Sequence, residues 1–207
     1  IFNSQQYIED VFVQPYMFWM PILGLFTGCR IEEICQIFCS DIVVHEGVWC
    51  LDINAKPGKK LKNVSSKRLV PLHPILSESL NFPAYVKRQA EDGHERVFHE
   101  LKKIGKGYAH AAGKWFNERY KKKIGLVGEA HNKQTFHSLR HTFETNLKHK
   151  LVPESIIKEL GGYAHQSEAM KRYGKPYIPG ILFKEGILRL DYGIDLSHLK
   201  NSKWVVR

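Results

Sequence analysis

The sequence predicts a mainly helical domain with a small three-stranded antiparallel β-sheet on one side. Apolar residues recur at spacings of three and four over most of the chain, which is typical of helices. Short runs of β-branched and aromatic residues, typical of strands, are concentrated in residues 42–72. With 207 residues, of which 43% are hydrophobic, the chain can bury one core, and we expect residues 1–207 to form a single domain.

The first part of the chain is expected to be helical. Residues 4–25 predict an amphipathic and then apolar helix that ends at Thr27-Gly28. The apolar run within it, residues 16–26, is too short to cross a bilayer and predicts a core helix. A second helix should begin near Arg30, because apolar residues follow at helical spacing, namely Ile31, Ile34, Cys35 and Phe38.

The four cysteines lack the spacing of a zinc site or a redox motif. Cys35 and Cys39 fall on the predicted buried face of the second helix, and the other two are Cys29 and Cys50. We therefore expect reduced thiols rather than zinc ligands or disulfides, which is typical of a cytoplasmic protein.

The strand pattern predicts a β-hairpin over residues 42–53 and a third strand over residues 68–72. Pro71 near the end of the third strand is compatible with an edge position. The loop between them, residues 56–67, carries five lysines. Its Gly and Ser residues make it mobile enough to bring an ammonium group against a phosphate.

Beyond the sheet the pattern becomes helical again. Residues 74–92 predict a helix that is interrupted near Pro83, and residues 93–98 predict a short extended piece. Residues 107–124 predict an amphipathic helix whose aromatic residues pack in the core and whose basic end faces nucleic acid. Further helices are expected before Pro153, over residues 154–160 and around residues 180–190.

Residues 136–143 place three potential phosphate ligands on one side of a helix. His137, Arg140 and His141 lie at positions i, i+3 and i+4, apart from an apolar row of Leu139, Phe143 and Leu147. One face can therefore pack while the other meets an anion. The 31 Lys and Arg residues against 21 Asp and Glu give a net charge of +10, which favours a polyanionic partner.

No cofactor is expected. The sequence contains no glycine-rich phosphate loop, so nucleotide-driven chemistry has no support. The pair His137 and His141 lacks the glutamate of a zinc protease and a third ligand, so no metal is expected either.

Four motifs together resemble the catalytic domain of a tyrosine recombinase, in particular a phage or genomic-island integrase. The resemblance extends from about residue 16 to about residue 190. Each motif alone is weak, but all four follow the order of the family at compatible spacings. They are Thr27-Gly-Cys-Arg-Ile-Glu-Glu33, the segment 62–72, His137-Ser-Leu-Arg-His-Thr-Phe143, and Leu160-Gly-Gly followed by Arg172-Tyr-Gly-Lys175.

The resemblance implies the catalytic-domain fold of that family and site-specific DNA recombination for the integration or excision of a mobile genetic element. In such enzymes a tyrosine hydroxyl attacks the scissile phosphate, forms a 3′-phosphotyrosyl link and releases a 5′-hydroxyl, without metal or ATP. Fixed cationic donors aimed at the non-bridging oxygens stabilise the transition state, where negative charge grows.

The resemblance also assigns roles to the charged residues. Arg30 and Arg140 would clamp the phosphate, since a guanidinium offers paired donors and keeps its charge. Glu33 would orient Arg30 or a neighbour. Lys62 would protonate the leaving 5′ oxygen, with rivals in the same loop, namely Lys59, Lys60 and Lys67.

The remaining roles fall on histidine and tyrosine. His137 would act as a general base or phosphate donor, with His141 as support, and Tyr173 would be the nucleophile. Tyr177 is the second candidate nucleophile, with a poorer local match after Pro176.

One position departs from the family, which usually has Leu-Gly-His where this chain has Leu160-Gly-Gly-Tyr163-Ala-His165. If the double glycine is aligned with the glycine of the family motif, Tyr163 takes the place of the histidine and would be the third phosphate donor. If the alignment is shifted by two residues, His165 takes that place. Both stay candidates.

The chain begins without Met, inside what already resembles a fold, so we expect an excised C-terminal catalytic domain without its N-terminal DNA-binding domain or domains. Double-stranded DNA carrying attachment sites is the expected partner, with tetramer assembly through residues 180–207 and accessory DNA-bending proteins. The expected location is the cytoplasm, in association with the nucleoid and away from membranes. The alternatives are a type IB topoisomerase-like enzyme and a non-catalytic DNA-binding module.

Overall fold

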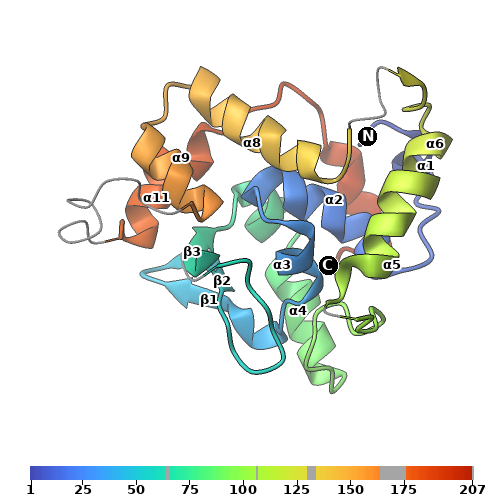
Figure 1. Ribbon diagram of the computed structural model, residues 1–207, viewed down its shortest axis with the longest axis horizontal. Coiled ribbons are helices and arrows are strands. Elements are labelled where there is room, and N and C mark those ends of the chain that lie inside the picture. The colour runs from blue at the N-terminus through green and yellow to red at the C-terminus, as the bar shows by residue number, and fades with distance from the viewer. Residues whose placement is uncertain (64–65, 106, 130–133, 164–175, 207) are drawn as a thin grey trace.

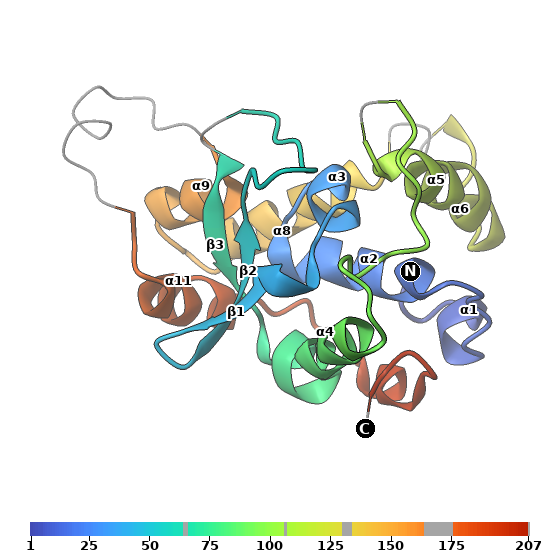
Figure 2. The same ribbon diagram turned by 90° about the horizontal axis from the view of Figure 1, so that it is seen from below.

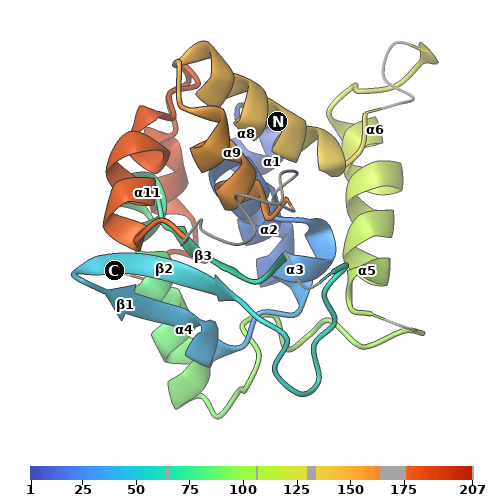
Figure 3. The ribbon, with the colours of Figure 1, turned by 60° about the vertical axis from the view of Figure 1, so that its left-hand side comes forward.

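The computed structural model describes residues 1–63, 66–105, 107–129, 134–163 and 176–206. Helix α2 (Pro15–Thr27) runs through the middle of the molecule, between α8 (His137–His149) and the short helix α3 (Ile31–Cys35) (Figure 1). A three-stranded sheet lies at one side, beside α9 (Glu154–Gly161) and α11 (Pro179–Glu185) (Figure 3). The predicted mainly helical fold with a small antiparallel sheet is therefore confirmed.

The predicted single helix over residues 4–25 is wrong in one respect, because the chain forms two helices there. Helix α1 spans Gln5–Ile8, and α2 begins only at Pro15. Proline has no backbone N–H and disfavours helical dihedrals in the residue before it, and Gln14 is indeed extended, with φ −133°. Helix α2 ends at the predicted breaker, where Gly28 adopts φ +62° and donates its N–H to the carbonyl of Gly24.

Glycines on α2 allow α8 to approach closely. A Cβ atom on Gly24 would lie 2.6 Å from the ring of Phe136, and one on Gly28 would lie 2.5 Å from the ring of Phe143. The predicted apolar row of α8 is buried in this contact, which confirms the face assigned to it: Leu139, Phe143 and Leu147. The packing brings the end of α2 and the first turns of α8 together.

The sheet has the order β1-β2-β3 and is antiparallel throughout, as predicted. Strands β1 (Ile42–His45) and β2 (Val48–Ile53) form the hairpin, and β3 (Arg68–Pro71) lies at the edge opposite β1. Leu51 faces Ile42 in β1 and Val70 in β3, so the apolar side chains of the three strands meet on one face. The short helix η1 (Cys39–Asp41) lies between α3 and β1 in the chain.

The middle of the chain follows the prediction with local differences. A π-helical turn, η3 (Ile75–Ser79), precedes α4 (Phe82–Glu91), and the interruption predicted near Pro83 occurs at Asn81, which has φ +47°. Residues 93–98 form no strand and contribute only a bridge between Phe38 and Arg96.

The helix predicted over residues 107–124 forms as three consecutive segments, α5 (Ala109–Lys114), η4 (Trp115–Tyr120) and α6 (Lys121–Lys123). Trp115, Phe116 and Tyr120 are buried, which confirms their assignment to the core. At the basic end, Lys121 differs from the expectation, because it is buried and donates to the carbonyl of Gln134, whereas Lys122 and Lys123 are exposed.

The C-terminal tail packs onto the chain's own core through η5 (Ile187–Arg189) and η6 (Ser197–Asn201). Its buried leucine and isoleucine side chains join the main hydrophobic cluster, and His198 bonds the carbonyl of Phe2 at 2.9 Å. The two ends of the chain are therefore neighbours, with η6 against α1 (Figure 2). Within the described ranges, no helix is both long and apolar enough to span a membrane.

The cysteines are free thiols. Cys29, Cys35 and Cys50 are buried, as expected of core residues, whereas Cys39 is only half-buried in η1. Burial raises the pKa of the Cys50 thiol to about 11, so this thiol stays protonated at neutral pH.

Candidate active site

The first charged pair lies at the start of α3. Arg30 is the N-cap residue, and Glu33 turns back to accept the Arg30 backbone N–H at 2.9 Å and its guanidinium at 2.8 Å. The carboxylate of Glu33 is almost fully buried, so this is not the surface ion pair that is typical of a helix start.

A second arginine, which sequence reasoning missed, binds the same carboxylate. Arg68 is the first residue of β3, and its guanidinium lies 3.0 Å from Glu33 Oε2. Arg68 stands opposite Ile53 in the sheet and shares a strand face with Val70, both of which are buried. The alternation of the strand was therefore the available signal that Arg68 points inward.

Arg30, Glu33 and Arg68 form an arginine–glutamate–arginine cluster with a net charge of +1 when all three are ionised. Burial by itself would raise the pKa of Glu33, but the charge and hydrogen bonds of Arg68, together with those of Arg30, hold the pKa below its usual value. The side chain of Arg30 is 19% exposed, against 3% for Glu33 and 3% for Arg68. Arg30 is therefore the member of the cluster that an external anion can reach.

Arg140 extends from α8 into the ends of two other helices. Its guanidinium donates to the carbonyl of Gly28 at 2.8 Å and to the carbonyl of Gly161 at 2.6 Å. Both carbonyls belong to helix C-terminal turns, where the helix dipole favours a cation. Arg140 thus joins α8, the α2–α3 turn and the end of α9.

The position of Arg140 corrects the sequence interpretation. His137 and His141 are exposed on α8, whereas the side chain of Arg140 is only 1% exposed and does not share their open face. The ring of Tyr163 covers it, with the guanidinium carbon 4.7 Å from the ring centroid. Glu144 pairs with Arg140 Nε at 3.0 Å and accepts the Tyr163 hydroxyl at 2.9 Å. The long arginine side chain finds its partners in the core, where carbonyls and a carboxylate surround it.

His137 links the two arginine groups electrostatically. Partial burial lowers its pKa, and the positive charges of His141, Arg140 and Arg30 lower it further. Its ring stands edge-on to that of His141, with centroids 4.7 Å apart. A histidine that is neutral near pH 7 can accept a proton, as a general base must.

Residues 56–67, the loop that carries five lysines, are called the lysine loop, and its residue Lys60 is held beside α3. The Gln36 side chain, just after α3, accepts from the backbone N–H of Lys60 at 2.8 Å and donates to its carbonyl at 2.9 Å. Lys59 lies 3% exposed in an ion pair with the buried Asp41, which withdraws it from the loop surface. Lys60, Lys62 and Lys67 are exposed. Among the four candidate lysines, Lys59 is therefore the least free to reach a phosphate.

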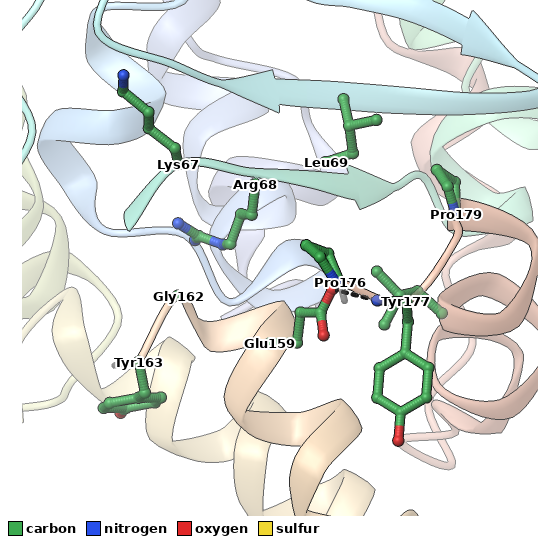
Figure 4. Close-up of a pocket in the computed structure, with 10 residues that line it drawn as sticks. Lys67, Arg68, Leu69, Glu159, Gly162, Tyr163, Pro176, Tyr177 and Pro179 are labelled. Atoms are coloured by element: carbon green, nitrogen blue, oxygen red, sulfur yellow. Dashed lines mark hydrogen bonds between the residues drawn. The ribbon is translucent and has the colours of Figure 1, made fainter. Parts of the chain in front are cut away.

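A cavity of about 300 Å³ lies between β3, α9 and α11. Figure 4 shows Arg68, Gly162 and Tyr163 on one side of it, whereas the ring of Tyr177 points away from them. The Tyr177 hydroxyl is 3.0 Å from Ser155 Oγ, and its backbone N–H donates to Glu159 at 2.8 Å. Tyr177 is thus held at α9, away from the arginines. Tyr173 and His165 lie outside the described residues.

Residues 19–177 match the phage integrase family, and the chain belongs to that family. It is similar to tyrosine recombinase XerA of Pyrococcus furiosus, with 29% identity over 143 residues that make up 68% of this chain and 44% of the relative. The chain therefore spans less than half the length of this relative.

Solved structures share the fold. The integrase of mycobacterium phage Brujita matches with a TM-score of 0.54 and 21% identity, over 97% of this chain and 60% of that one. The integrase of the Tn1549 transposon, solved in complex with transposon right end DNA, matches with a TM-score of 0.52 and 20% identity, over 84% of this chain and 57% of that one. The expected integrase-type fold is thus confirmed.

Proposed function

We propose that this chain is the catalytic part of a site-specific DNA recombinase that cuts and rejoins DNA strands through a 3′-phosphotyrosyl intermediate. The observation that carries the proposal is the gathering of Arg30, Arg140 and His137 around the α2–α3 turn, although Arg140 is 112 residues from the Gly28 carbonyl that it binds. Charged donors of this kind stabilise the additional negative charge of a phosphoryl transition state. Membership of the phage integrase family supports the same reaction.

In the proposed reaction the Tyr173 hydroxyl attacks phosphorus, and the bond from phosphorus to the 5′ oxygen breaks. His137 takes the tyrosine proton, and Lys62 gives a proton to the leaving oxygen. Arg30 and Arg140 donate to the non-bridging oxygens. Rejoining is the reverse, since the phosphotyrosyl bond keeps the energy of the phosphodiester.

Arg140 is covered by Tyr163, and this affects how it could bind a phosphate. The ring of Tyr163 covers the guanidinium, and its hydroxyl donates a hydrogen bond to Glu144. Direct contact of Arg140 with a phosphate therefore requires Tyr163 to move aside. The third donor to the phosphate is then either Tyr163, after its hydroxyl leaves Glu144, or His165.

Double-stranded DNA with attachment sites is the proposed partner, supported by the net charge of +10 and by the DNA complex of the similar Tn1549 integrase. We propose that copies assemble as a tetramer on DNA with accessory DNA-bending proteins, in the cytoplasm at the nucleoid. Exchange of residues 180–207 between copies would require their release from the chain's own core, where several of their side chains are buried.

The proposal is tested with a nicked suicide substrate that carries the cognate site, followed by denaturing electrophoresis. We expect a covalent protein–DNA adduct that Tyr173→Phe abolishes. An unchanged adduct in Tyr173→Phe would remove the nucleophile assignment. DNA binding without any adduct would favour a binding module, and relaxation of supercoiled DNA that lacks paired sites would favour a topoisomerase-like enzyme.

A further inference from the structure

We propose that Arg68 is a positioning residue that holds Glu33 and makes the charge of the Arg30 cluster positive. This inference rests on the proposed function, in which Arg30 binds the scissile phosphate. The guanidinium of Arg68 is occupied by the Glu33 carboxylate and by two backbone carbonyls, so its effect on the phosphate passes through Glu33 and Arg30.

Arg68 shares both carboxylate oxygens of Glu33 with Arg30. Oε1 lies 2.8 Å from the Arg30 guanidinium and 3.4 Å from that of Arg68. Oε2 lies 2.9 Å from the Arg30 backbone nitrogen and 3.0 Å from the Arg68 guanidinium. The carboxylate is therefore held from two sides, and it fixes the side chain of Arg30 in turn.

The second arginine also changes the charge that a phosphate meets. Arg30 and Glu33 alone form a neutral pair, in which the carboxylate competes with a phosphate for the same guanidinium. Arg68 neutralises that carboxylate from the buried side and leaves the cluster with one net positive charge. Since the cluster is largely shielded from water, this charge acts on a nearby phosphate more strongly than a surface lysine does.

Arg68 further connects the two segments that must meet at the phosphate. Its guanidinium donates to the carbonyl of Leu160 at 2.7 Å and to that of Ser66 at 2.8 Å. Ser66 lies at the end of the lysine loop, and Leu160 lies in the last turn of α9, just before Tyr163. A Cβ atom on Gly162 would lie 2.6 Å from the Arg68 guanidinium, so the backbone after α9 is packed directly on this side chain.

Arg96 provides a matched control. It stacks on the rings of Phe38 and Tyr108 and donates to the carbonyl of Gly58 at 3.3 Å, at the other end of the same loop. Arg96→Gln therefore removes one positive charge and one contact to the lysine loop, as Arg68→Gln does, but leaves Glu33 untouched.

The first readout is the rate of adduct formation on the nicked suicide substrate at saturating chain. We expect Arg68→Gln to lower this rate about 10- to 100-fold, as is usual for residues that orient a reacting group, with little change in DNA affinity. Arg96→Gln should stay within about threefold of the parent chain. Arg68→Lys, which keeps the charge, should lie between the two.

The second readout needs no cleavage. Inorganic phosphate should raise the thermal unfolding midpoint of the parent chain. Phosphate should raise the midpoint of Arg30→Gln less, and the difference between the two rises measures phosphate binding at Arg30. Arg68→Gln should lose this Arg30-dependent rise, while Arg68→Lys and Arg96→Gln keep it. The double variant Glu33→Gln/Arg68→Gln should recover the Arg30-dependent rise, since removal of the carboxylate restores the net charge of +1. This recovery would not occur if Arg68 only supported the fold.

The two readouts distinguish a failure of the proposed function from a failure of the inference about Arg68. A parent chain that forms no adduct contradicts the proposed function, and the phosphate response then still decides the role of Arg68. Equal behaviour of Arg68→Gln and Arg96→Gln in the phosphate response would overturn the inference. If Arg68→Gln does not fold, a folded Arg68→Lys that lacks the Arg30-dependent response, or a folded double variant that lacks it, overturns the inference in the same way.

Discussion

Single residues at this site are ionised although they are buried, and Glu33 is the clearest case. Removing a buried partner leaves the opposite charges uncompensated, which typically costs about 3–5 kcal/mol. We therefore expect Glu33→Gln to lower the free energy of unfolding by roughly that amount at neutral pH, as measured by urea unfolding. Glu154→Gln is the matched control, because Glu154 forms an exposed pair with Lys158 and its loss should leave stability unchanged.

The same residue predicts a pH dependence. The pKa of Glu33 is depressed in the folded chain, so its contribution to stability is complete above the unfolded pKa, about 4.3, and is lost as the pH falls through the lower folded value. The parent chain should lose stability below about pH 4.3 more steeply than Glu33→Gln does. If the two chains lose stability equally as the pH falls, Glu33 is not held ionised by its arginines.

The third phosphate donor is the next question at the scale of one residue. The Tyr163 hydroxyl already donates to the Glu144 carboxylate, a charge-assisted bond that a phosphate would have to replace. We expect His165→Ala to slow adduct formation about 100-fold and Tyr163→Phe, which keeps the ring over Arg140, less than about tenfold. The opposite order in single-turnover assays would assign the donor role to Tyr163.

Only some contacts of the single site residues could be predicted from the sequence. Arg30 and Glu33 were identifiable because they are one helical turn apart, and their pairing needs only local geometry. The ion pair between Arg68 and Glu33 joins a strand to a helix 35 residues away in the sequence, and a local sequence pattern cannot predict a contact over that separation. Arg140 was found by motif, but its burial depends on carbonyls from two other helices.

At the scale of elements, the contact between α2 and α8 places Gly28 where its carbonyl holds Arg140. Gly28→Ala combines an unfavourable φ of +62° with a Cβ atom 2.5 Å from Phe143. Gly93→Ala has a similar φ of +83° but open space around it. We expect Gly28→Ala to cost about 1–3 kcal/mol more than Gly93→Ala in urea unfolding, because overpacking adds to the backbone strain. Equal losses would mean that the ring of Phe143 yields without cost.

The lysine loop makes a separate prediction for catalysis. Lys62→Ala should abolish adduct formation on a normal substrate, because the leaving 5′ oxygen then lacks its proton donor. A 5′-bridging phosphorothiolate should restore it, since sulfur leaves without protonation. Lys60→Ala is the matched control from the same loop and should cleave both substrates. Failure of the phosphorothiolate to restore cleavage would assign the proton transfer to another lysine.

Element types were more predictable than their limits. The strands and α9 follow directly from side-chain pattern and glycine breaks, because each is local and strongly patterned. The break between α1 and α2 was missed, since the aromatic and apolar residues on both sides continue a helical spacing across Pro15. In that segment the proline backbone outweighs the side-chain pattern.

At the scale of the whole molecule, the fold brings charge to one region from distant parts of the chain. Helix α3, strand β3, helix α8 and the end of α9 each supply a side chain or a carbonyl to the arginine network. The tail packs on α1 and α2, where η6 contacts α1 and Tyr192 donates to the carbonyl of Leu25 at 2.7 Å. We therefore infer that the fold positions arginine charge against the charge of a phosphodiester.

A substrate whose scissile phosphate is a methylphosphonate, in which a methyl group replaces one charged oxygen, tests whether Arg30 acts through its charge. Adduct formation is compared for the parent chain and Arg30→Gln on this substrate and on a normal phosphodiester. We expect Arg30→Gln to lose cleavage of the phosphodiester and to recover it on the neutral linkage, where less charge needs stabilisation. An equal loss on both linkages would contradict the claim that Arg30 acts through its charge.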